Sequence, residues 1–370
     1  MTETLKRTPL YEEHRRAGAK IIPFAGWEMP VHYPAGIVAE HNLVRKVAGL
    51  FDVCHMGELE VRGPQALDLV QYVTTNDASR LEVGQAQYSV ICHEDGGAVD
   101  DCIVYRFPDH YMIVVNASNA VKDREWIRTH TGHFDASLTD RSDETGLIAL
   151  QGPQAQPILQ RLTSTPLEDI GYYRFVEGQV GGIDAVISRT GYTGEDGFEL
   201  YVPAGEAPRL WRLLLGAGDV EGVAPIGLGA RDSLRLEMGY ALYGNDLDDR
   251  RTPLEAGLGW VTKLDKGDFI GREALQRLKQ QGIRDRLVGF VLQERGFPRH
   301  GYTVRYDGEE AGEVTSGIVS PSTGQGVGMA YVPTEAAKPG TPIEIVVRDR
   351  AVPAEVVRPP FYRNGSVRKQ

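Results

Sequence analysis

Two stretches of the chain share the same order of apolar and polar positions. Residues 61–74 and residues 150–163 each read as a short apolar strand, a Gly-Pro pair and an amphipathic helix. Apolar side chains that recur three and four residues apart define one face of a helix, and proline is tolerated in its first turn. The match predicts one structural unit that occurs twice.

The similarity continues beyond the helix at a nearly constant offset. Each copy proceeds through a glycine pair, a strand, a turn, a second strand and a helix that contains a tryptophan. These features fall at Gly96-Gly97, 102–107, 111–116 and Trp126 in the first copy, and at Gly181-Gly182, 185–190, 198–202 and Trp211 in the second. We therefore expect an α+β fold of duplicated strand–helix–strand–strand units of the split βαβ kind, with a pocket between the halves.

The pattern changes after the second copy. Helices are expected at 227–238 and at 272–281, where Gly282 is a normal helix stop. From Asp285 onward, short alternating runs separated by turn residues predict a small β-barrel or sandwich. We expect a first region at 1–270 and, at 271–370, a helix linker with the C-terminal β-barrel domain. Within the first region the two subdomains are expected at 45–135 and 136–225, and the segments 1–44 and 226–270 are expected to pack around them.

Composition narrows the functional classes. The 370 residues carry a formal net charge of −11, so a nucleic-acid partner is not expected. No apolar run approaches the roughly 20 residues of a membrane helix, and the first residues lack an apolar signal core, which favours a cytoplasmic protein. Three scattered cysteines predict neither a disulfide framework nor a thiolate zinc site, and no carboxylate motif accompanies His130 and His133.

A pair of carboxylates, Asp100-Asp101, precedes the first apolar strand of the first copy. Alternation along an extended chain sends the two side chains to opposite faces, so only one of them can face a buried pocket. A solvated turn is the simpler interpretation of these residues considered alone.

A second candidate is the glycine-rich segment 188–200. Three glycines within seven residues allow a close backbone approach to a ligand, and the strand that follows places Phe198 and Leu200 on one face and Glu199 on the other. A long hairpin with a wet face explains the same pattern. The glycine spacing fits neither a Rossmann fold nor a P-loop.

Two further features stand in the C-terminal half. Arg231 sits at the start of an expected helix, where a positive charge is unfavourable, so an anionic ligand or a structural salt bridge explains its presence. The tail 359–363 is rich in proline and aromatic residues and is expected to dock onto the body of the protein. The residues considered alone therefore predict a two-lobed pocket with carboxylates and an arginine.

These stretches closely resemble the T protein family of the glycine cleavage system. The resemblance spans essentially the whole chain, and the segments that carry it are 8–14, 24–30, 51–57, 188–200, 227–232, 243–246, 313–317 and 360–363. One departure is Cys54, which stands where many members have serine and is a plausible packing position. The resemblance implies an aminomethyltransferase with the α+β fold and the C-terminal barrel expected above.

The resemblance also implies the reaction and its participants. A lipoylated H protein presents an aminomethyl group on the sulfur of its lipoyl arm, and the enzyme passes the one-carbon unit to tetrahydrofolate with release of ammonia. The products are 5,10-methylenetetrahydrofolate and dihydrolipoyl H protein. Neither a metal nor pyridoxal phosphate is expected, and no membrane partner is implied.

The family's functional positions map onto single residues of this chain. Asp101 matches the functional aspartate, which orients the folate nitrogens and stabilises positive charge; the resemblance does not decide whether it also removes a proton. Glu199 matches the carboxylate that recognises the pterin. The other positions implied to contact folate or line its pocket are Arg231, Arg363, Tyr88, Asn116, Tyr192 and Tyr240.

Two other functions are compatible with such a scaffold. A related enzyme could demethylate a different one-carbon donor onto folate, because such relatives share the pterin pocket and differ in the donor channel. A folate-binding accessory protein of iron–sulfur assembly would lack transferase activity. The accessory proteins carry a cysteine motif in the region of 188–195, where this chain has no cysteine.

Overall fold

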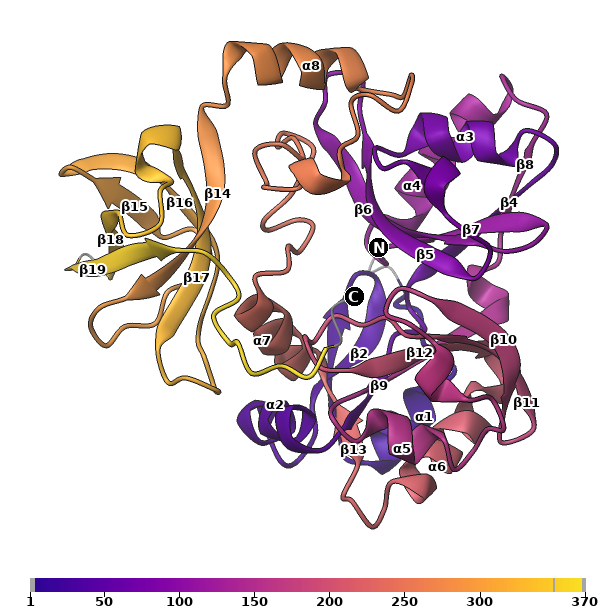
Figure 1. The fold of residues 1–370 in the computed structure, drawn as a ribbon. Helices are drawn as coiled ribbons and strands as arrows, with labels where there is room; N and C mark the ends of the chain where they lie inside the picture. The colour runs from indigo at the N-terminus through magenta and orange to yellow at the C-terminus, as the bar shows by residue number, and fades with distance from the viewer. Residues whose placement is uncertain (1–3, 349, 368–370) are drawn as a thin grey trace.

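The computed structural model describes residues 4–348 and 350–367, which form two face-to-face α+β lobes and a separate barrel (Figure 1). The first lobe contains a five-stranded sheet in the order β5 (Gln85–Cys92), β6 (Ala98–Arg106), β7 (His110–Val115), β4 (Gly57–Arg62) and β8 (Ser137–Asp140). The second contains a six-stranded sheet in the order β10 (Phe175–Val180), β11 (Ile183–Ser188), β12 (Gly197–Pro203), β9 (Thr145–Gln151), β3 (Gly49–Asp52) and β13 (Ala224–Ile226).

The strand order confirms the duplication. Four neighbouring strands run β5-β6-β7-β4 in the first sheet and β10-β11-β12-β9 in the second, in the same order of occurrence along the chain. Each copy has one strand more than the repeat predicted, because β5 and β10 come before the glycine pairs rather than after them. Both extra strands mix polar with apolar side chains, which weakens the alternation by which strands are predicted.

The helices cover the outer faces of the two sheets. Helices α3 (Ala66–Val73) and α4 (Ala120–Thr131) lie on the first sheet, and α5 (Ala155–Leu159) and α6 (Ala207–Ala217) lie on the second (Figure 1). Trp211 of α6 is 2% exposed in the core beneath that helix, together with Phe198 and Leu200. The opposite faces of the sheets meet each other through Tyr105 and Tyr201, whose rings pack edge to face.

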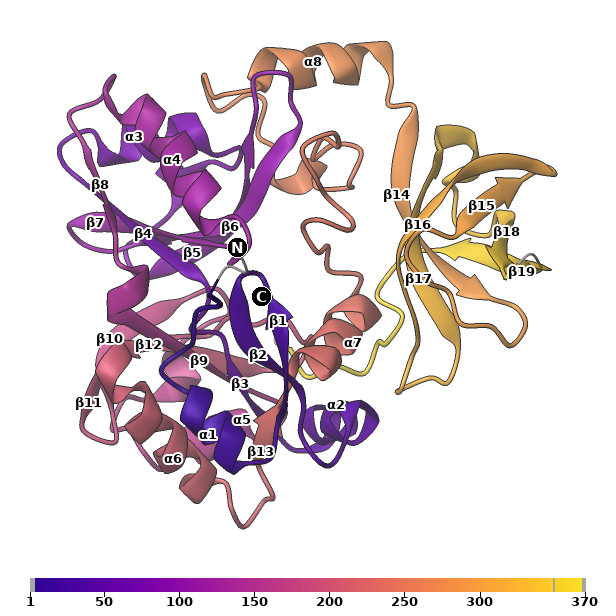
Figure 2. The ribbon, with the colours of Figure 1, turned by 180° about the vertical axis from the view of Figure 1, so that it is seen from behind.

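The N-terminal segment packs against the second lobe. Helix α1 (Tyr11–Arg16) and the hairpin of β1 (Lys20–Phe24) and β2 (Trp27–His32) lie in front of the second sheet when the molecule is seen from behind (Figure 2). Helix α2 (Ile37–Lys46) packs against α7 (Leu228–Met238) beside this sheet. No helix within the described ranges is long and apolar enough to cross a membrane.

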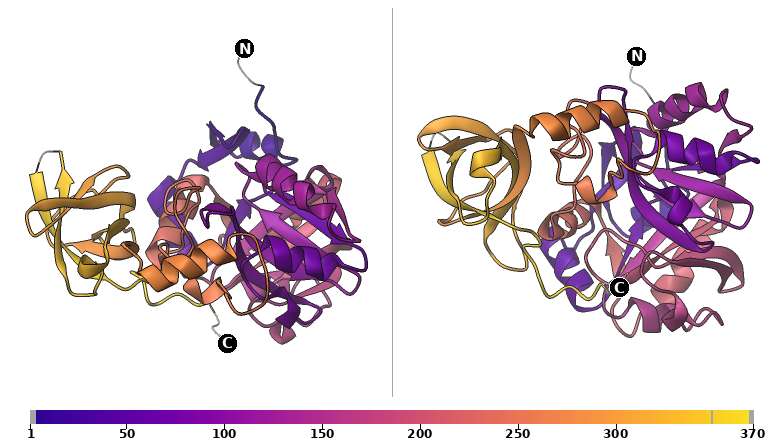
Figure 3. Two further views of the ribbon diagram at one scale, coloured as in Figure 1. Left: turned by 90° about the horizontal axis from the view of Figure 1, so that it is seen from above. Right: turned by 45° about the horizontal axis from the view of Figure 1, so that its top comes forward.

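The last part of the chain forms a closed barrel at the side of the lobes. Helix α8 (Arg272–Gln281) runs from the first lobe toward it and ends at Gly282, as the sequence predicted (Figure 3). The barrel order is β14 (Asp285–Leu292), β17 (Gly326–Pro333), β16 (Glu309–Val319), β15 (Thr303–Tyr306), β18 (Pro342–Val347) and β19 (Arg350–Val357). The prediction of an all-β C-terminal domain is therefore confirmed, and closure removes its free strand edges.

A buried carboxylate, Glu237 at the end of α7, joins these parts. Its oxygens accept hydrogen bonds from Arg45 of α2, at 2.8 Å, and from Ser320 and Ser322 of the barrel. The main-chain carbonyl of Glu237 accepts the backbone N–H groups of Phe361 and Tyr362, so the tail docks here as expected. The second lobe, the barrel and the tail thus all contact one fully buried residue, Glu237.

The two sheets are also cross-linked by main-chain contacts. The amide of Ala86 in β5 donates to the carbonyl of Tyr173, and a bridge pairs Gln85 with Arg174. Tyr173 has a φ of 59°, an uncommon conformation for a bulky residue. The segment before β10 is therefore held against the first sheet.

Removing Glu237 is expected to destabilise the whole assembly. Glu237→Ala leaves the Arg45 guanidinium buried without this partner, which costs about 3–5 kcal/mol in the free energy of unfolding. Urea denaturation followed by tryptophan fluorescence measures the effect. The control is Glu273→Ala on α8, whose carboxylate is 83% exposed and pairs with Arg277 at 3.7 Å, with an expected loss below about 1 kcal/mol. Equal losses in the two variants would contradict the role given to Glu237.

Candidate functional site

Asp101 lies in the middle of β6 and points toward the space between the two sheets. Its carboxylate accepts a hydrogen bond from the hydroxyl of Tyr88 on β5 at 2.9 Å and one from the side-chain amide of Asn116 at 2.9 Å. Asn116 follows β7, the strand that pairs with β6 on its other side. Neighbouring strands of one sheet therefore fix the carboxylate from both sides.

Asp100 points to the opposite face, as strand alternation predicted. It is fully buried and accepts hydrogen bonds from the Asn116 side chain at 2.8 Å, the Asn116 main-chain amide at 3.0 Å and the Asn119 side chain at 2.8 Å. The pair is thus not a solvated turn, because both carboxylates are built into the sheet. Only Asp101 faces the space between the lobes.

The electrostatic surroundings of Asp101 disfavour its charge. Burial raises the pKa of Asp101 first, and the charge of Asp100 raises it further, whereas the hydrogen bonds from Tyr88 and Asn116 lower it. The net result is a pKa of about 7. A carboxyl group with such a pKa can change protonation near neutral pH.

Glu199 lies on β12 of the second copy, on the face opposite Phe198 and Leu200. It is 9% exposed, so the strand face that a simple hairpin would leave wet is buried between the lobes. Its carboxylate accepts the hydroxyl of Thr190, which in turn lies 3.3 Å from the hydroxyl of Tyr105 in the first sheet. Burial raises the pKa of Glu199, and the Thr190 hydrogen bond and the charge of Arg231 oppose that rise.

Arg231, in the first turn of α7, completes the charged part of the site. Its guanidinium lies 4.8 Å from the ring centre of Tyr192, and the Tyr192 ring stacks on Tyr240 at 5.7 Å. Within the described part of the chain this guanidinium forms no ion pair, so the structural salt bridge considered from the sequence is not what holds it. Its charge remains available to an anionic or electron-rich ligand.

The structure brings seven of the eight predicted positions into one region. The charges of both Asp101 and Arg231 act on the pKa of Tyr192, and those of Asp101 and Glu199 both act on Tyr173, which places the carboxylates and the arginine around the same tyrosines. The residues concerned are Tyr88, Asp101, Asn116, Tyr192, Glu199, Arg231 and Tyr240. Their contribution to folate binding or to catalysis stays a prediction.

Arg363 is the exception. It belongs to the docked tail, but its side chain is exposed. The neighbouring Tyr362 ring instead lies under the Arg45 guanidinium at 4.3 Å. The predicted contact between Arg363 and folate therefore stays untested.

Sequence reasoning missed several aromatic residues of the site. Tyr172 and Tyr173 pack edge to face at 5.0 Å in the segment before β10, and Trp260 stacks on Tyr88 at 6.0 Å while remaining 63% exposed. The adjacent tyrosines in a loop were the available signal for the first pair. No local pattern marks Trp260, because only the path of residues 239–271 brings it to Tyr88.

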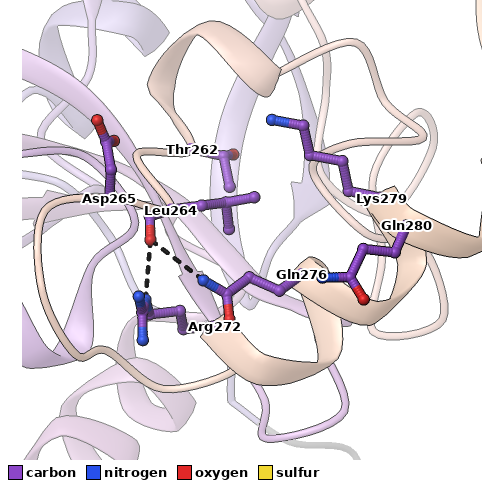
Figure 4. Close-up of a pocket in the computed structure, with 7 residues that line it drawn as sticks. All are labelled: Thr262, Leu264, Asp265, Arg272, Gln276, Lys279 and Gln280. Carbon is purple, nitrogen blue, oxygen red and sulfur yellow. Dashed lines mark hydrogen bonds between the residues drawn. The ribbon is translucent and has the colours of Figure 1, made fainter.

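Two hollows at the surface lie beside this region. One is lined by polar and charged side chains between α8 and residues 262–265, where Arg272 and Gln276 donate to the carbonyl of Leu264 (Figure 4). A second hollow includes Trp260 in its wall. No predicted site residue lines either hollow. The second hollow lies next to the site because Trp260, in its wall, stacks on Tyr88.

Comparison with known proteins defines the class of the chain. Residues 10–266 match the family model of the GCVT N-terminal domain, and residues 286–363 match that of the glycine cleavage T-protein C-terminal barrel domain. The second match coincides with the barrel described above. The two models together cover most of the chain.

Full-length relatives agree with the family models. The chain is 52% identical to an aminomethyltransferase of Symbiobacterium thermophilum, with 98% of this chain and 99% of that protein covered. It is 53% identical to an aminomethyltransferase of Rubrobacter xylanophilus, with 97% and 95% covered. The crystal structure of glycine cleavage system aminomethyltransferase T from Bartonella henselae superposes with a TM-score of 0.92 at 38% identity, covering 98% of this chain and 100% of that one. The chain thus belongs to the glycine cleavage T-protein family and is an aminomethyltransferase of the glycine cleavage system.

The titration of Asp101 follows from its surroundings. We expect the Asp101 carboxyl of the ligand-free protein to titrate at a pH of about 7 in a carbon-13 NMR titration. Tyr88→Phe removes a hydrogen bond that stabilises the ionised form, so the midpoint should rise by about 0.5–1 unit. Tyr11→Phe, which alters an aromatic residue bonded to Glu28 instead, should leave the midpoint unchanged. A midpoint near that of a solvated aspartate, or a fall in Tyr88→Phe, would refute this account of the site.

Proposed function

We propose that the region around Asp101, Glu199 and Arg231 binds tetrahydrofolate and transfers to it the one-carbon unit of an aminomethyl-lipoyl H protein. The observation that supports this most directly is the placement of Asp101. It is a partly buried carboxylate, oriented from two strands and surrounded by tyrosines, and it faces the lobe that carries Glu199. A flat, electron-rich ring system can pack between such aromatic walls.

The chemistry of the donor explains why a carboxylate is needed. The transferred carbon lies between sulfur and nitrogen, so departure of ammonia with the electron pair of the C–N bond leaves a carbon cation stabilised by sulfur. The folate N5 then bonds to this carbon and loses its proton, and the C–S bond breaks with its electron pair returning to sulfur, which takes up a proton as the dihydrolipoyl thiol. N10 closes the second bond and loses its proton, which the released ammonia takes up. Ionised Asp101 stabilises the positive charge and orients the folate nitrogens.

Glu199 and Arg231 are proposed to recognise the folate. An ionised carboxylate accepts two donors side by side, which matches the amino group and ring N–H of a pterin. Glu199 is suited to this role because it is buried, accepts a hydrogen bond from Thr190 alone among the described residues, and has its charged form favoured by Arg231. Arg231 and the Tyr192–Tyr240 stack supply the adjoining wall, and Arg363 of the tail is proposed as a further folate contact.

The full-length match to aminomethyltransferases favours this function over the two alternatives considered from the sequence, and one assay distinguishes the three directly. A demethylase on the same scaffold would share the folate residues and use another donor, whereas a folate-binding accessory protein would show no turnover. Ammonia release from aminomethyl-loaded H protein, measured with and without tetrahydrofolate, separates the three. Release that requires both this protein and folate supports the proposal, and absence of acceleration despite folate binding would overturn it.

Asp101→Asn is expected to lower turnover by about 10²–10³-fold, because the amide cannot carry the negative charge that stabilises the cationic carbon. Tetrahydrofolate should still bind, with Kd changed by less than about threefold. Turnover is measured as ammonia release and binding by calorimetry. Asp109→Asn, in the exposed turn between β6 and β7, serves as the control and should behave as the unaltered protein. Equal losses of binding and rate would make Asp101 a binding residue instead.

Glu199→Ala is expected to weaken tetrahydrofolate binding by about 10²–10⁴-fold, because each of the two hydrogen bonds to the charged group contributes about 1.5–3 kcal/mol. Titration calorimetry measures the change. Glu177→Ala on β10, an exposed carboxylate of the same sheet, provides the matched control. Superimposable titration curves for Glu199→Ala and the unaltered protein would exclude the pterin contact.

A further inference from the structure

A third carboxylate lies behind Asp100, on the side away from the proposed folate site. Asp123, in the first turns of α4, is fully buried, and neither of its oxygens has a hydrogen-bond donor among the described residues. A buried carboxylate without a donor is costly, and a protein relieves this cost by protonating the group. The catalytic scheme above makes no use of Asp123.

Asp100 is the acceptor to which a protonated Asp123 donates. Two ionised carboxylates have no proton to share, so each is a poor partner for the other; a proton on one of them converts the pair into a donor and an acceptor. The pKa of Asp123 is raised to about 11. Burial is the largest cause, followed by the charge of Asp100 and by a hydrogen bond with Asp100. Asp100 is the better charged partner because it already accepts three N–H groups.

The same contacts continue outward to the proposed catalytic group. The side-chain nitrogen of Asn116 lies 2.8 Å from an oxygen of Asp100 and 2.9 Å from an oxygen of Asp101. Its two hydrogens therefore serve one carboxylate each, and the rotation of the amide is fixed by both. At the start of α4 the amide of Asp123 donates to the carbonyl of Asn119, and the Asn119 side chain donates to Asp100. A line of hydrogen bonds therefore leads from the first turn of α4 through Asp100 and Asn116 to Asp101.

We propose that Asp123 is a positioning residue for the transfer reaction: as a protonated acid it donates to Asp100, holds that carboxylate in place, and through Asn116 governs the position and protonation of Asp101. Only the expected effect on turnover rests on the proposed function. The link between Asp123 and the titration of Asp101 holds whatever reaction Asp101 serves.

Other groups that face this line supply no alternative donor to Asp123. Lys122 precedes it on α4, but its ammonium group donates to the carbonyl of Val99 and lies 3.0 Å from the hydroxyl of Tyr243. The Tyr243 hydroxyl itself donates to the carbonyl of Ala98. The Cys102 thiol, on β6, has a pKa raised by burial and by the neighbouring aspartates, so it stays neutral. On the far side Tyr88 and Tyr192 face Asp101.

Two substitutions of Asp123 separate donation from packing. Asp123→Asn keeps a neutral N–H donor of the same shape, so the Asp101 midpoint should stay within about 0.3 units and turnover within about threefold of the unaltered enzyme. Asp123→Leu keeps the branched shape of the side chain with bulkier ends and removes the donor. Asp100 then loses a partner on the side of α4 and holds Asn116 less firmly, so Asp101 loses part of the hydrogen bond that lowers its pKa. The Asp101 midpoint and the acidic limb of the rate profile should therefore rise by about one unit, and maximal turnover should fall about tenfold as the carboxylate loses its support.

The readouts are carbon-13 NMR titration of Asp101 and the pH profile of ammonia release, both on the full-length protein. An unchanged midpoint in a folded Asp123→Leu protein would overturn the proposal, as would equal shifts in Asp123→Asn and Asp123→Leu. If Asp101→Asn retained full turnover, the proposed function of Asp101 would fail, whereas the NMR comparison would still decide the role of Asp123.

A second measurement does not depend on the folding of Asp123→Leu. The infrared difference spectrum between the unaltered protein and Asp123→Asn, taken about two pH units above the Asp101 midpoint, should contain the C=O stretching band of one protonated carboxylic acid. Its absence would show that Asp123 is ionised and would refute the proposal. Asp100→Asn offers an independent check, because removal of the Asp100 charge should lower the Asp101 midpoint, whereas Asp123→Leu leaves that charge in place and should raise the midpoint.

Discussion

The architecture depends on the buried carboxylate of Glu237. Burial alone would raise its pKa, but His41, Ser320 and Arg45 bring it down to about 2, so the group is ionised at neutral pH. Arg45, paired with this carboxylate, also donates to Glu195 and to the carbonyl of Thr193 in the glycine-rich segment. One satisfied charge thus aligns the barrel, the tail and the loop that leads into the Glu199 strand.

The proposed site follows a different electrostatic rule. Around Glu237 every charge is matched, whereas around Asp101 and Glu199 the carboxylates are buried with few donors, and Arg231 makes no ion pair among the described residues. Unmatched charges are costly in the folded protein and become favourable when a ligand supplies the missing partners. The stability of the first network therefore offsets the cost of the second, which is the arrangement expected where binding and chemistry occur.

Local sequence patterns predicted a large part of this structure. The repeat indicated two related halves, alternation along β6 placed Asp100 and Asp101 on opposite faces, and alternation along β12 placed Glu199 opposite Phe198. These features depend on neighbours along one strand, which is what periodicity reports. Arg231 stood out in the sequence because a positive charge at the start of a helix is unfavourable. The roles of Tyr88, Asn116, Tyr192 and Tyr240 came from the family resemblance alone, since no local pattern marks these residues.

The remaining features depend on contacts between distant segments. Asp123 lies in the charged run Lys122 to Glu125, which reads as a solvated helix surface, and only the packing of α4 against the first sheet buries it. Trp260 reaches Tyr88 through a segment with little regular structure. Such placements are tertiary, so a single sequence without its fold contains no direct signal for them.

The duplication described above has produced unequal halves. Glu199 pairs with Ala149 across β12 and β9, and the matching position of the first copy pairs Met112 with Glu60 across β7 and β4. Met112 packs into the apolar cluster between the sheets, where the second copy has its buried carboxylate. The first copy therefore contributes Asp101 to the proposed site, and the second copy contributes Glu199. The first half could not reproduce the site as a symmetric pair with itself, because Met112 stands where Glu199 is needed. The second half has an aspartate, Asp184, at the position that matches Asp101, but this residue is exposed and accepts a hydrogen bond from Gln179 instead.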